Sequence, residues 1–142
     1  MSQKVRRLNY FSVFLYHLTG GRAYAGSTED QAGILRLTTT GRKSGKQRMV
    51  HLMYIRAGSD YVITASNGGS QRHPGWYYNV QGDKPVMIDL KDQQLQVTAK
   101  VAEPEQRARL WAELLKTAPM FAGYENRTKR TIPMVILQPI TQ

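Results

Sequence analysis

Short strand-like segments follow one another along this chain, and turn-length connections separate most of them. Each segment is rich in β-branched and aromatic residues or alternates apolar with polar residues, as the strands of a half-buried sheet do. The predicted strands are residues 34–39, 48–56, 61–65, 86–90, 95–101 and 132–138. Because helical segments do not alternate regularly with these strands, a parallel doubly wound sheet is disfavoured. The pattern instead predicts a mainly β (α+β) fold, a small antiparallel barrel of about six strands with a few helices.

Helical patterns fill much of the remaining chain. Apolar residues recur at helical spacing within 4–18, which predicts a short basic amphipathic helix, followed by a polar linker. Further helices are predicted to start at Pro74 and to cover 105–116 and 120–126. The 142 residues make one ordinary domain, so we expect a single domain with the helix and linker in 1–32 and the barrel in 33–142.

The formal net charge of the chain is +10, and the chain contains no cysteine. The charge favours an anionic partner, which could be a phosphorylated small molecule, an acidic membrane surface or a nucleic acid. The lack of cysteine excludes disulfides, thiolate catalysis and thiolate metal sites. Because the sequence shows neither an apolar run of spanning length nor a signal core, we expect a cytoplasmic protein. Its N-terminal helix could bring it to a membrane surface as a peripheral contact.

The excess positive charge is concentrated in the turn between the first two predicted strands. Residues 38–48 have the sequence TTTGRKSGKQR, with three consecutive hydroxyls, two glycines and four cations but no carboxylate. This spacing resembles a nucleotide P-loop superficially, but it is one residue short and is followed by a strand instead of a helix. We therefore expect either a hairpin loop that surrounds phosphate oxygens with amides, hydroxyls and cations, or a solvated basic turn.

The sequence gives little support for a metal site or for a catalytic nucleophile. The histidines are His17, His51 and His73, and no two of them have the spacing of metal ligands. We expect a structural role for His51 and a loop-capping role for His73. The sequence contains the residue types of a catalytic triad in Ser66, His73 and Asp83, but the serine does not lie in a GxSxG nucleophile elbow. We predict no metal site.

Aromatic residues gather in two segments beyond the basic turn, at Trp76, Tyr77, Tyr78, Phe121 and Tyr124. Aromatic rings beside a basic surface can stack on a planar conjugated ligand or on single-stranded nucleic acid. Each ring taken alone is equally well explained by packing in the core. The complete pattern of motifs therefore has to decide between these interpretations.

Four motifs stand in register between residues 34 and 139. They are LTTTGRKSGKQR, TASNGG, RHPGWYYN, and Tyr124 followed by RTIPMVILQP. Together they resemble the deazaflavin-dependent nitroreductase family, whose members use coenzyme F420. The resemblance implies a split antiparallel β-barrel of the FMN-binding-like type. It also implies an oxidoreductase that passes a hydride from the reduced deazaflavin to an electrophilic acceptor such as a quinone, an activated alkene or a nitroaromatic compound.

The resemblance implies roles for individual residues as well. Lys43 and Arg48 match the leading contacts to the coenzyme phosphate. The lesser contacts match Thr39, Thr40 and Ser44. The residues that match the region beside the ring system are Ala65, Ser66, Asn67, Gly68 and Trp76. Tyr124 matches an aromatic residue of the acceptor pocket. The proton for the reduced acceptor is expected to come from solvent, or from Tyr124 or Ser66 through water.

The chain departs from this family in the pocket. Asn67 stands where many relatives have a lysine, and Phe121 and Ala118 stand where some nitroreductases have tyrosines. The first departure removes a cation beside the coenzyme, and the second removes hydrogen bonds to a nitro substrate. The alternatives are an FMN-using reductase and a non-catalytic protein that binds a lipid or an anionic metabolite on the same barrel. We expect a small-molecule electron acceptor, no nucleic-acid partner, and a monomer or homodimer.

Overall fold

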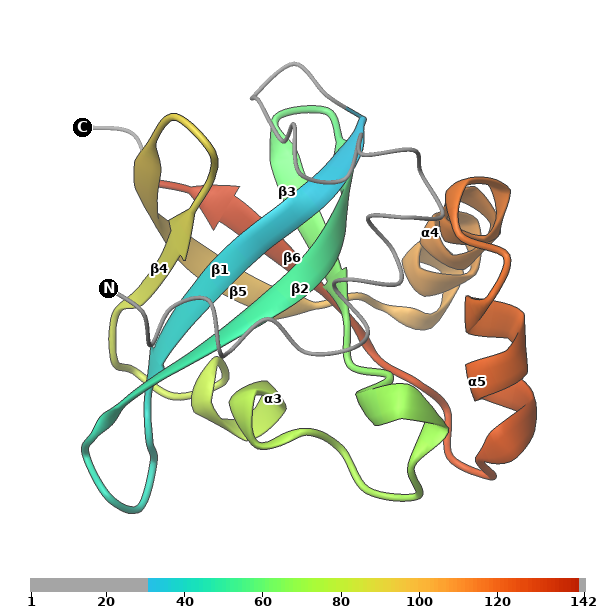
Figure 1. The fold of residues 1–142 in the computed structure, drawn as a ribbon, viewed down its shortest axis with the longest axis horizontal. Helices are drawn as coiled ribbons and strands as arrows, with labels where there is room; N and C mark the ends of the chain where they lie inside the picture. The colour runs from blue at the N-terminus through green and yellow to red at the C-terminus, as the bar shows by residue number, and fades with distance from the viewer. Residues whose placement is uncertain (1–30, 141–142) are drawn as a thin grey trace.

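A computed structural model of the protein describes residues 31–140, which form a closed barrel of six antiparallel strands (Figure 1). The strands are β1 (Ala32–Thr40), β2 (Gln47–Ala57), β3 (Asp60–Thr64), β4 (Val86–Asp89), β5 (Gln94–Val101) and β6 (Met134–Pro139). The helical segments are the short 3₁₀ turn η2 (Asn67–Gly69) and the helices α3 (Gly75–Asn79), α4 (Pro104–Thr117) and α5 (Phe121–Arg127). The structure therefore confirms the predicted antiparallel barrel with a few helices.

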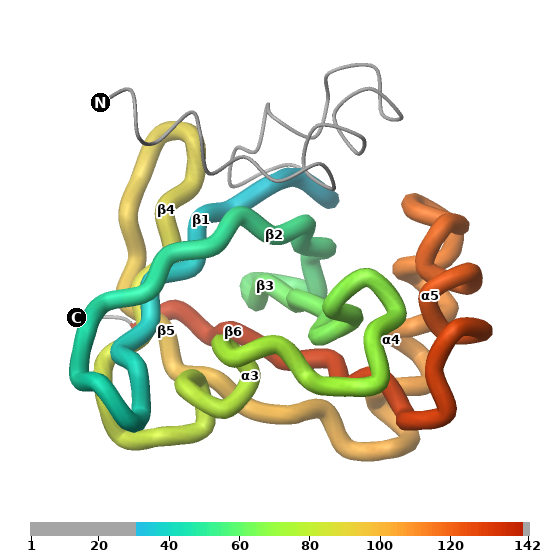
Figure 2. The backbone as a smooth tube through the Cα atoms, turned by 60° about the horizontal axis from the view of Figure 1, so that its bottom comes forward, coloured from blue at the N-terminus to red at the C-terminus, as the bar shows by residue number. Residues whose placement is uncertain are grey.

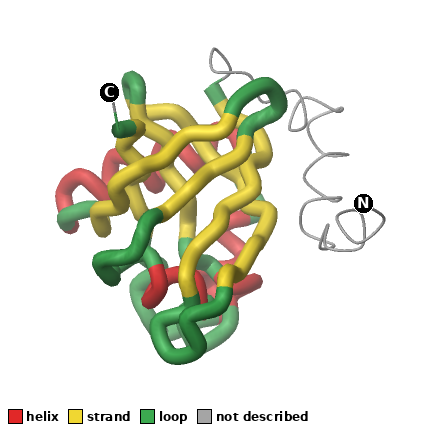
Figure 3. The backbone as a smooth tube through the Cα atoms, turned by 90° about the vertical axis from the view of Figure 1, so that its left-hand side faces the viewer, coloured by secondary structure: helices red, strands yellow, loops and turns green. Residues whose placement is uncertain are grey.

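Each strand has two neighbours in the ring, in the order β1-β2-β3-β6-β5-β4, and β4 pairs back onto β1. The pairs β1–β2, β2–β3 and β4–β5 are hairpins between strands that are adjacent in sequence, as predicted. The pairs β3–β6 and β1–β4 join strands far apart in the chain and close the ring. Figure 3 shows the strands of the barrel in yellow, with helical segments at its lower end. Within the described residues, each strand therefore has a hydrogen-bonded neighbour on both sides for at least part of its length.

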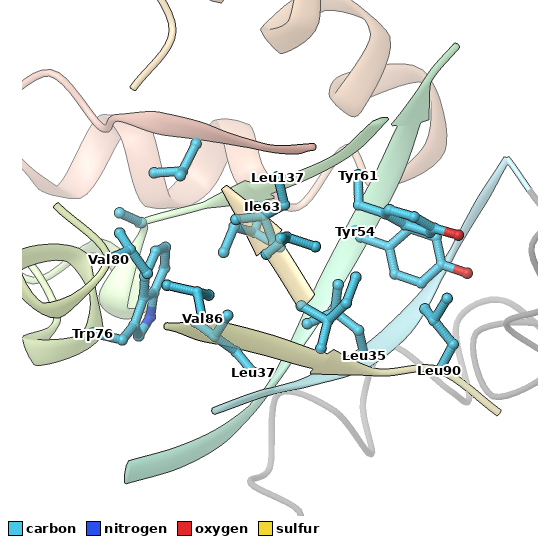
Figure 4. Packing of buried hydrophobic residues seen from close by; sticks show 14 residues of the cluster. Leu35, Leu37, Tyr54, Tyr61, Ile63, Trp76, Val80, Val86, Leu90 and Leu137 are labelled. Carbon is cyan, nitrogen blue, oxygen red and sulfur yellow. The ribbon is translucent and has the colours of Figure 1, made fainter. Parts of the chain in front are cut away.

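Alternate strand residues point into the barrel and fill it with apolar side chains. This interior cluster takes Leu35, Leu37, Tyr54, Tyr61, Ile63, Val86, Ile88, Val97, Val135 and Leu137 from the six strands. The rings of Tyr54 and Tyr61 meet edge to face, with centroids 5.2 Å apart, toward one end of the barrel (Figure 4). Trp76 and Val80, from α3 and the residue that follows it, pack beside Val86 at the other end. The helix α3 is thus anchored in the barrel core by its tryptophan.

The helices α4 and α5 lie against the outer face of one part of the barrel, as Figure 2 shows. Outward-pointing strand residues pack there with helix residues in a second cluster that includes Ile34, Met53, Ile55, Val62, Trp111, Leu114 and Phe121. Apolar residues on both faces of the segment 48–56 predict a strand that is covered on two sides, which the structure confirms for Met53, Tyr54 and Ile55, all buried. Near the β1–β2 turn this prediction is wrong, because Met49 is 39% exposed within the described part of the chain.

The outer face of β5 is open to solvent. Gln96, Thr98 and Lys100 are exposed, whereas Val97 between them points into the barrel and is buried. The alternation of apolar and polar residues over 95–101 predicts such a strand with one wet face, and the structure confirms it. None of the helices in the described residues is long and apolar enough to span a membrane.

The last strand begins at Met134 and not at Ile132 as predicted. Pro133 has no amide hydrogen to give to a neighbouring strand, while its carbonyl accepts a hydrogen bond from the Ala65 amide at 2.9 Å. Ile132 is nonetheless completely buried under the helices. The predicted N-terminal helix over 4–18 lies outside the described residues, and the division of the chain at residue 32 stays a prediction.

Candidate functional site

The β1–β2 turn is closed by its own hydrogen bonds. The Gly41 amide donates to the Lys46 carbonyl at 2.7 Å, and the Gly45 amide donates to the Gly41 carbonyl at 2.8 Å. The Lys46 amide donates to the Ser44 hydroxyl at 3.1 Å. A Cβ atom on Gly41 would lie 2.6 Å from the Ser44 hydroxyl oxygen, so any other residue would displace that side chain. The turn therefore presents its cations from a defined backbone.

Asn79, the last residue of α3, attaches this helix to the turn. Its side-chain nitrogen donates to the Thr39 hydroxyl at 3.2 Å, and its side-chain oxygen accepts from the Arg42 amide at 3.1 Å. The Arg42 guanidinium also lies over the ring of Tyr78, 4.9 Å from its centroid. Because Thr39 is only 2% exposed, these contacts tie the turn to the buried end of β1. The basic turn is thus held by both β1 and α3.

A cavity of about 420 Å³ lies between the turn and α3, and we call it the cationic cavity. The predicted site residues that line it are Thr39, Lys43, Ser44, Arg48 and Trp76. Arg42, Tyr78 and Asn79 line it as well, although the sequence did not assign them to the site. Three lining side chains are cations and none is a carboxylate, so the cavity favours an anionic ligand.

A second cavity of about 210 Å³ lies between β2, the loop after β3, and α5, and we call it the tyrosine cavity. The predicted residues that line it are Ser66, Asn67, Gly68, Trp76 and Tyr124. An apolar wall is formed by Val50, Leu52, Met53 and Phe121. Val50 and Trp76 line both cavities, so the two adjoin. The pair can accept one ligand that has an anionic end and a flat apolar ring.

Two of the predicted site residues line neither cavity. Thr40 is the last residue of β1 and faces Gln47 across the hairpin. Ala65 is completely buried, and its amide donates to the Pro133 carbonyl at 2.9 Å. A direct contact of either residue with a coenzyme remains a prediction. A contact through the Ala65 amide is disfavoured, because this amide already donates to the Pro133 carbonyl.

The loop after β3 has an unusual backbone that suits its residues. Asn67, Gly68 and Gly69 all have positive φ, at 47°, 64° and 83°. Asparagine is one of the few side chains that adopt this conformation readily, and the Asn67 side chain donates to the Arg72 carbonyl at 3.1 Å. A Cβ atom on Gly69 would come within 3.0 Å of the Tyr124 carbonyl. Asn67 therefore supports the loop, which packs directly on α5.

Tyr124 lines the tyrosine cavity from α5. Its ring meets Phe121 edge to face at a centroid distance of 5.3 Å, and its hydroxyl donates to the sulfur of Met120, a weak acceptor, at 3.8 Å. Burial raises the pKa of Tyr124 above its usual value, and the charge of Arg127 opposes this to a smaller extent. Tyr124 is therefore protonated at neutral pH and can donate a hydrogen bond.

Arg130 contacts the same loop from the segment before β6, and the sequence analysis did not identify it. Its guanidinium lies 2.9 Å from Nδ1 of His73, and burial lowers the pKa of His73, assisted by the charge of Arg130. Since its partners are more than fifty residues away, nothing local distinguishes Arg130 from the neighbouring basic residues 127 and 129. The signal that could have pointed to it is its place at the start of the last matched motif.

Comparison with known proteins agrees with this geometry. The sequence model of the F420H2-dependent quinone reductase family matches residues 10–139. An F420H2-dependent quinone reductase of Mycobacterium tuberculosis is 41% identical over 106 residues, which are 72% of this chain and 71% of that protein. A solved F420-H2 dependent reductase superposes with a TM-score of 0.67 at 39% identity, over 74% of this chain and 93% of that one. A second solved structure, a domain-swapped dimer, reaches a TM-score of 0.68 at 33% identity, over 89% and 98% of the two chains. The protein therefore belongs to the F420H2-dependent quinone reductase family, a family of oxidoreductases that use coenzyme F420.

Proposed function

We propose that this protein transfers a hydride from reduced coenzyme F420 to a quinone, with the coenzyme phosphate in the cationic cavity and its ring beside Trp76. The observation that carries this proposal is that the two cavities adjoin at Val50 and Trp76. The cationic cavity, which suits an anion, and the tyrosine cavity, which suits an apolar ring, are therefore adjacent. The coenzyme has the same two parts, an anionic phosphate and a planar conjugated ring.

The residues of the cationic cavity fit a phosphate. Lys43 and Arg48 provide a flexible ammonium and a planar guanidinium, which suit phosphate oxygens as a point charge and as a two-pronged donor. The backbone at Gly75 leaves open space, since a Cβ atom there would meet nothing within 4 Å. Ser44 and Thr39 add hydroxyls, although Ser44 already accepts a hydrogen bond from the backbone of the turn.

The residues of the tyrosine cavity fit a ring and its acceptor. The buried indole of Trp76 offers a flat wall, and the backbone of Ser66, Asn67 and Gly68 offers amides to ring carbonyls. When bound, reduced F420 supplies the hydride, and the protein supplies position, electrostatics and exclusion of water. No side chain is required to act as a nucleophile.

Tyr124 is proposed to assist proton delivery. Reduction of a quinone to a hydroquinone consumes one hydride and one proton, and negative charge develops on a quinone oxygen in between. A phenol that stays protonated at neutral pH can donate a hydrogen bond to that oxygen. Ser66, which lines the same cavity, is a second candidate and would act through water.

The walls of the tyrosine cavity favour a quinone over a nitro compound. Phe121 lines the cavity where some nitroreductases have a tyrosine, and Ala118 is completely buried at the position of another. Leu52 and Met53 extend the apolar surface. The apolar side chains at these positions offer no donors to a nitro group and suit a weakly polar ring with a carbonyl oxygen better.

A fluorescence titration with F420 and, in parallel, with FMN tests the choice of coenzyme. We expect saturable binding of F420 that is tighter than binding of FMN, and oxidation of reduced F420 when menadione is added as the quinone. Tighter binding of FMN would overturn the coenzyme assignment. Binding of F420 without any turnover of menadione would instead support a non-catalytic binding protein on this fold.

The remaining partner predictions stand as proposals. A homodimer is supported by the domain-swapped dimer among the relatives, whereas closure of the barrel in one chain supports a monomer. A cytoplasmic location and a peripheral membrane contact rest on the sequence alone, and the net charge of +10 supports attraction to an anionic surface. Light scattering of the purified protein and sedimentation with anionic vesicles would test both points.

A further inference from the structure

The guanidinium of Arg130 binds four acceptors on one segment of the chain. Its Nη2 donates to the carbonyls of Ala65 at 3.1 Å and Ser66 at 2.9 Å, and its Nε donates to the carbonyl of Ser70 at 2.9 Å. Its Nη1 lies 2.9 Å from Nδ1 of His73. Because a guanidinium has no acceptor, Nη1 must donate, and His73 must therefore be neutral with its proton on Nε2.

Arg130 is itself held in place. Its amide donates to the Thr128 hydroxyl at 3.3 Å, and that hydroxyl donates to the side-chain oxygen of Gln71 at 3.1 Å. The side-chain nitrogen of Gln71 donates to the Arg127 carbonyl at 2.9 Å. These hydrogen bonds join the segment before β6 to the loop after β3. They also fix the direction from which the Arg130 guanidinium approaches the loop.

This contact sets the direction of two amides. No peptide bond in the described residues is cis, and in a trans peptide the N–H points opposite to the C=O. Since Arg130 holds the carbonyls of Ala65 and Ser66, the amides of Ser66 and Asn67 point away from it. Both residues line the tyrosine cavity and Arg130 does not, which favours an orientation of these amides toward the cavity. Within residues 31–140 neither amide donates a hydrogen bond to the protein.

The charge of Arg130 strengthens these two donors. No carboxylate within the described residues forms an ion pair with it, so its charge is balanced there only by carbonyl dipoles and the His73 ring. A cation bound to a peptide carbonyl polarises that peptide and makes its N–H a better donor. Arg130 thereby places positive potential behind the loop at the point where Asn67 lacks the lysine of many relatives.

We infer that Arg130 is a positioning residue that orients and polarises the amides of Ser66 and Asn67 to bind a carbonyl oxygen of the coenzyme ring. The inference rests on the proposed function, which puts the ring in the tyrosine cavity. Two convergent backbone amides form a site for an oxygen that carries partial negative charge, and they need no rearrangement when a ligand arrives. Arg130 supplies the fixed geometry without touching the ligand.

The first test measures F420 affinity and the visible absorption of the bound coenzyme in Arg130→Lys and Arg130→Ala. An ammonium cannot reach four acceptors in a plane, so we expect Arg130→Lys to weaken binding about tenfold, the scale of one charge-assisted hydrogen bond. We expect Arg130→Ala to weaken it further, to reduce the spectral shift on binding, and to recover part of both when millimolar guanidinium is added. The matched control is Lys129→Ala, which removes the same charge one residue earlier from an exposed position and should bind F420 within about twofold of wild type.

A variant that melts at a lower temperature but binds F420 as tightly as wild type, with the same spectral shift, would reduce Arg130 to a structural role and overturn the inference. If Arg130→Ala does not fold, Arg130→Lys decides. A second measurement needs no variant: the amide proton resonances of Ser66 and Asn67 in the wild-type protein should move downfield when F420 binds. Saturable binding with both resonances unmoved would sink the inference alone. Absence of saturable F420 binding would instead overturn the proposed function.

Discussion

The four cations of the basic turn are not equivalent. Lys43 and Arg48 line the cationic cavity, whereas Lys46 does not. We predict that Lys43→Ala and Arg48→Ala each weaken F420 binding by about 1 to 3 kcal/mol, because each removes a charge-assisted contact to phosphate. Lys46→Ala is the matched control, since it changes the net charge of the same turn by the same amount.

Fluorescence titration at two salt concentrations would measure these effects. General electrostatic attraction would affect all three variants alike and disappear at high salt, whereas direct contacts should persist for the two lining residues. Equal and small losses in the three variants would mean that the turn is only a solvated basic surface.

Tyr124 is predicted to act on the acceptor more than on the coenzyme. We expect Tyr124→Phe to lower kcat/KM for menadione roughly tenfold, the value of one lost hydrogen bond in the transition state, while the Kd for F420 stays near that of wild type. Steady-state kinetics together with the coenzyme titration would separate the two effects. An unchanged kcat/KM would leave Ser66 or solvent as the source of the proton.

His73 links folding stability to pH. Burial and, to a lesser extent, Arg130 lower the pKa of His73 in the folded protein, while the rings of Tyr77 and Tyr78 pack against it. The unfolded chain therefore binds a proton more readily, so the stability contributed by neutral His73 is complete above its unfolded pKa of about 6.5 and is lost as the pH falls toward the folded value.

Urea unfolding at a series of pH values would test this linkage. His73→Asn is the informative variant, because its side-chain oxygen can accept from Arg130 in place of Nδ1 but cannot be protonated. Stability of the variant should fall less than that of wild type on acidification. Identical pH profiles for the two proteins would contradict the prediction.

At the scale of elements, α3 is the connector between the two cavities. Trp76 packs in the barrel core and Asn79 binds the basic turn. This five-residue helix therefore fixes the position of the tyrosine cavity relative to the cationic cavity. We predict that Asn79→Ala weakens F420 binding by about 1 to 2 kcal/mol through loss of its hydrogen bonds at the turn. Hydrogen exchange of residues 41–46 should quicken in the same variant.

Asn79→Asp provides the comparison for that experiment. It keeps an oxygen that can accept from the Arg42 amide but loses the donor to Thr39. Because the new carboxylate lines the cationic cavity and repels an anionic ligand, F420 affinity is expected to fall further than in Asn79→Ala, whereas hydrogen exchange of the turn should quicken less than in Asn79→Ala. Unaltered exchange of the turn in Asn79→Ala would show that the turn is held by its internal hydrogen bonds alone.

The elements of this fold follow from local pattern, but the contacts that complete the site do not. Alternation in β5 and the glycine-rich turns predict strands and hairpins because these depend on neighbouring residues. Arg130 and Asn79 act on partners distant in sequence, and a single sequence has no signal for such pairing. The motif resemblance supplied Lys43 and Arg48, since residue types at fixed spacing carry that information, whereas the composition of the turn alone did not separate them from Lys46.

At the scale of the whole molecule, the barrel interior and the helix-covered face are expected to unfold together. Leu137 lies in the interior cluster and Leu114 lies on the buried face of α4, and both are almost completely buried. Replacing either leucine by alanine should lower the free energy of unfolding by about 2 to 5 kcal/mol, because each leaves a cavity.

The two tryptophans allow a direct check of this cooperativity. Trp76 reports on the end of the barrel and Trp111 on the α4 face, so variants that retain one of them resolve the two regions by fluorescence during urea unfolding. Coincident transitions are expected in both leucine variants. Separate midpoints would show that the helices detach from an intact barrel.

The ring order has a consequence for how the protein is made. β6 pairs with both β3 and β5, and it is the last strand of the described chain to leave the ribosome. Until it emerges, the nascent chain holds two open sheet edges and lacks Arg130, which stands just before that strand. Because synthesis proceeds from the N-terminus, the hydrogen bonds between Arg130 and the loop after β3 form last. Until then the nascent protein exposes unpaired strand edges, which are prone to aggregate and need protection before the protein can bind its coenzyme.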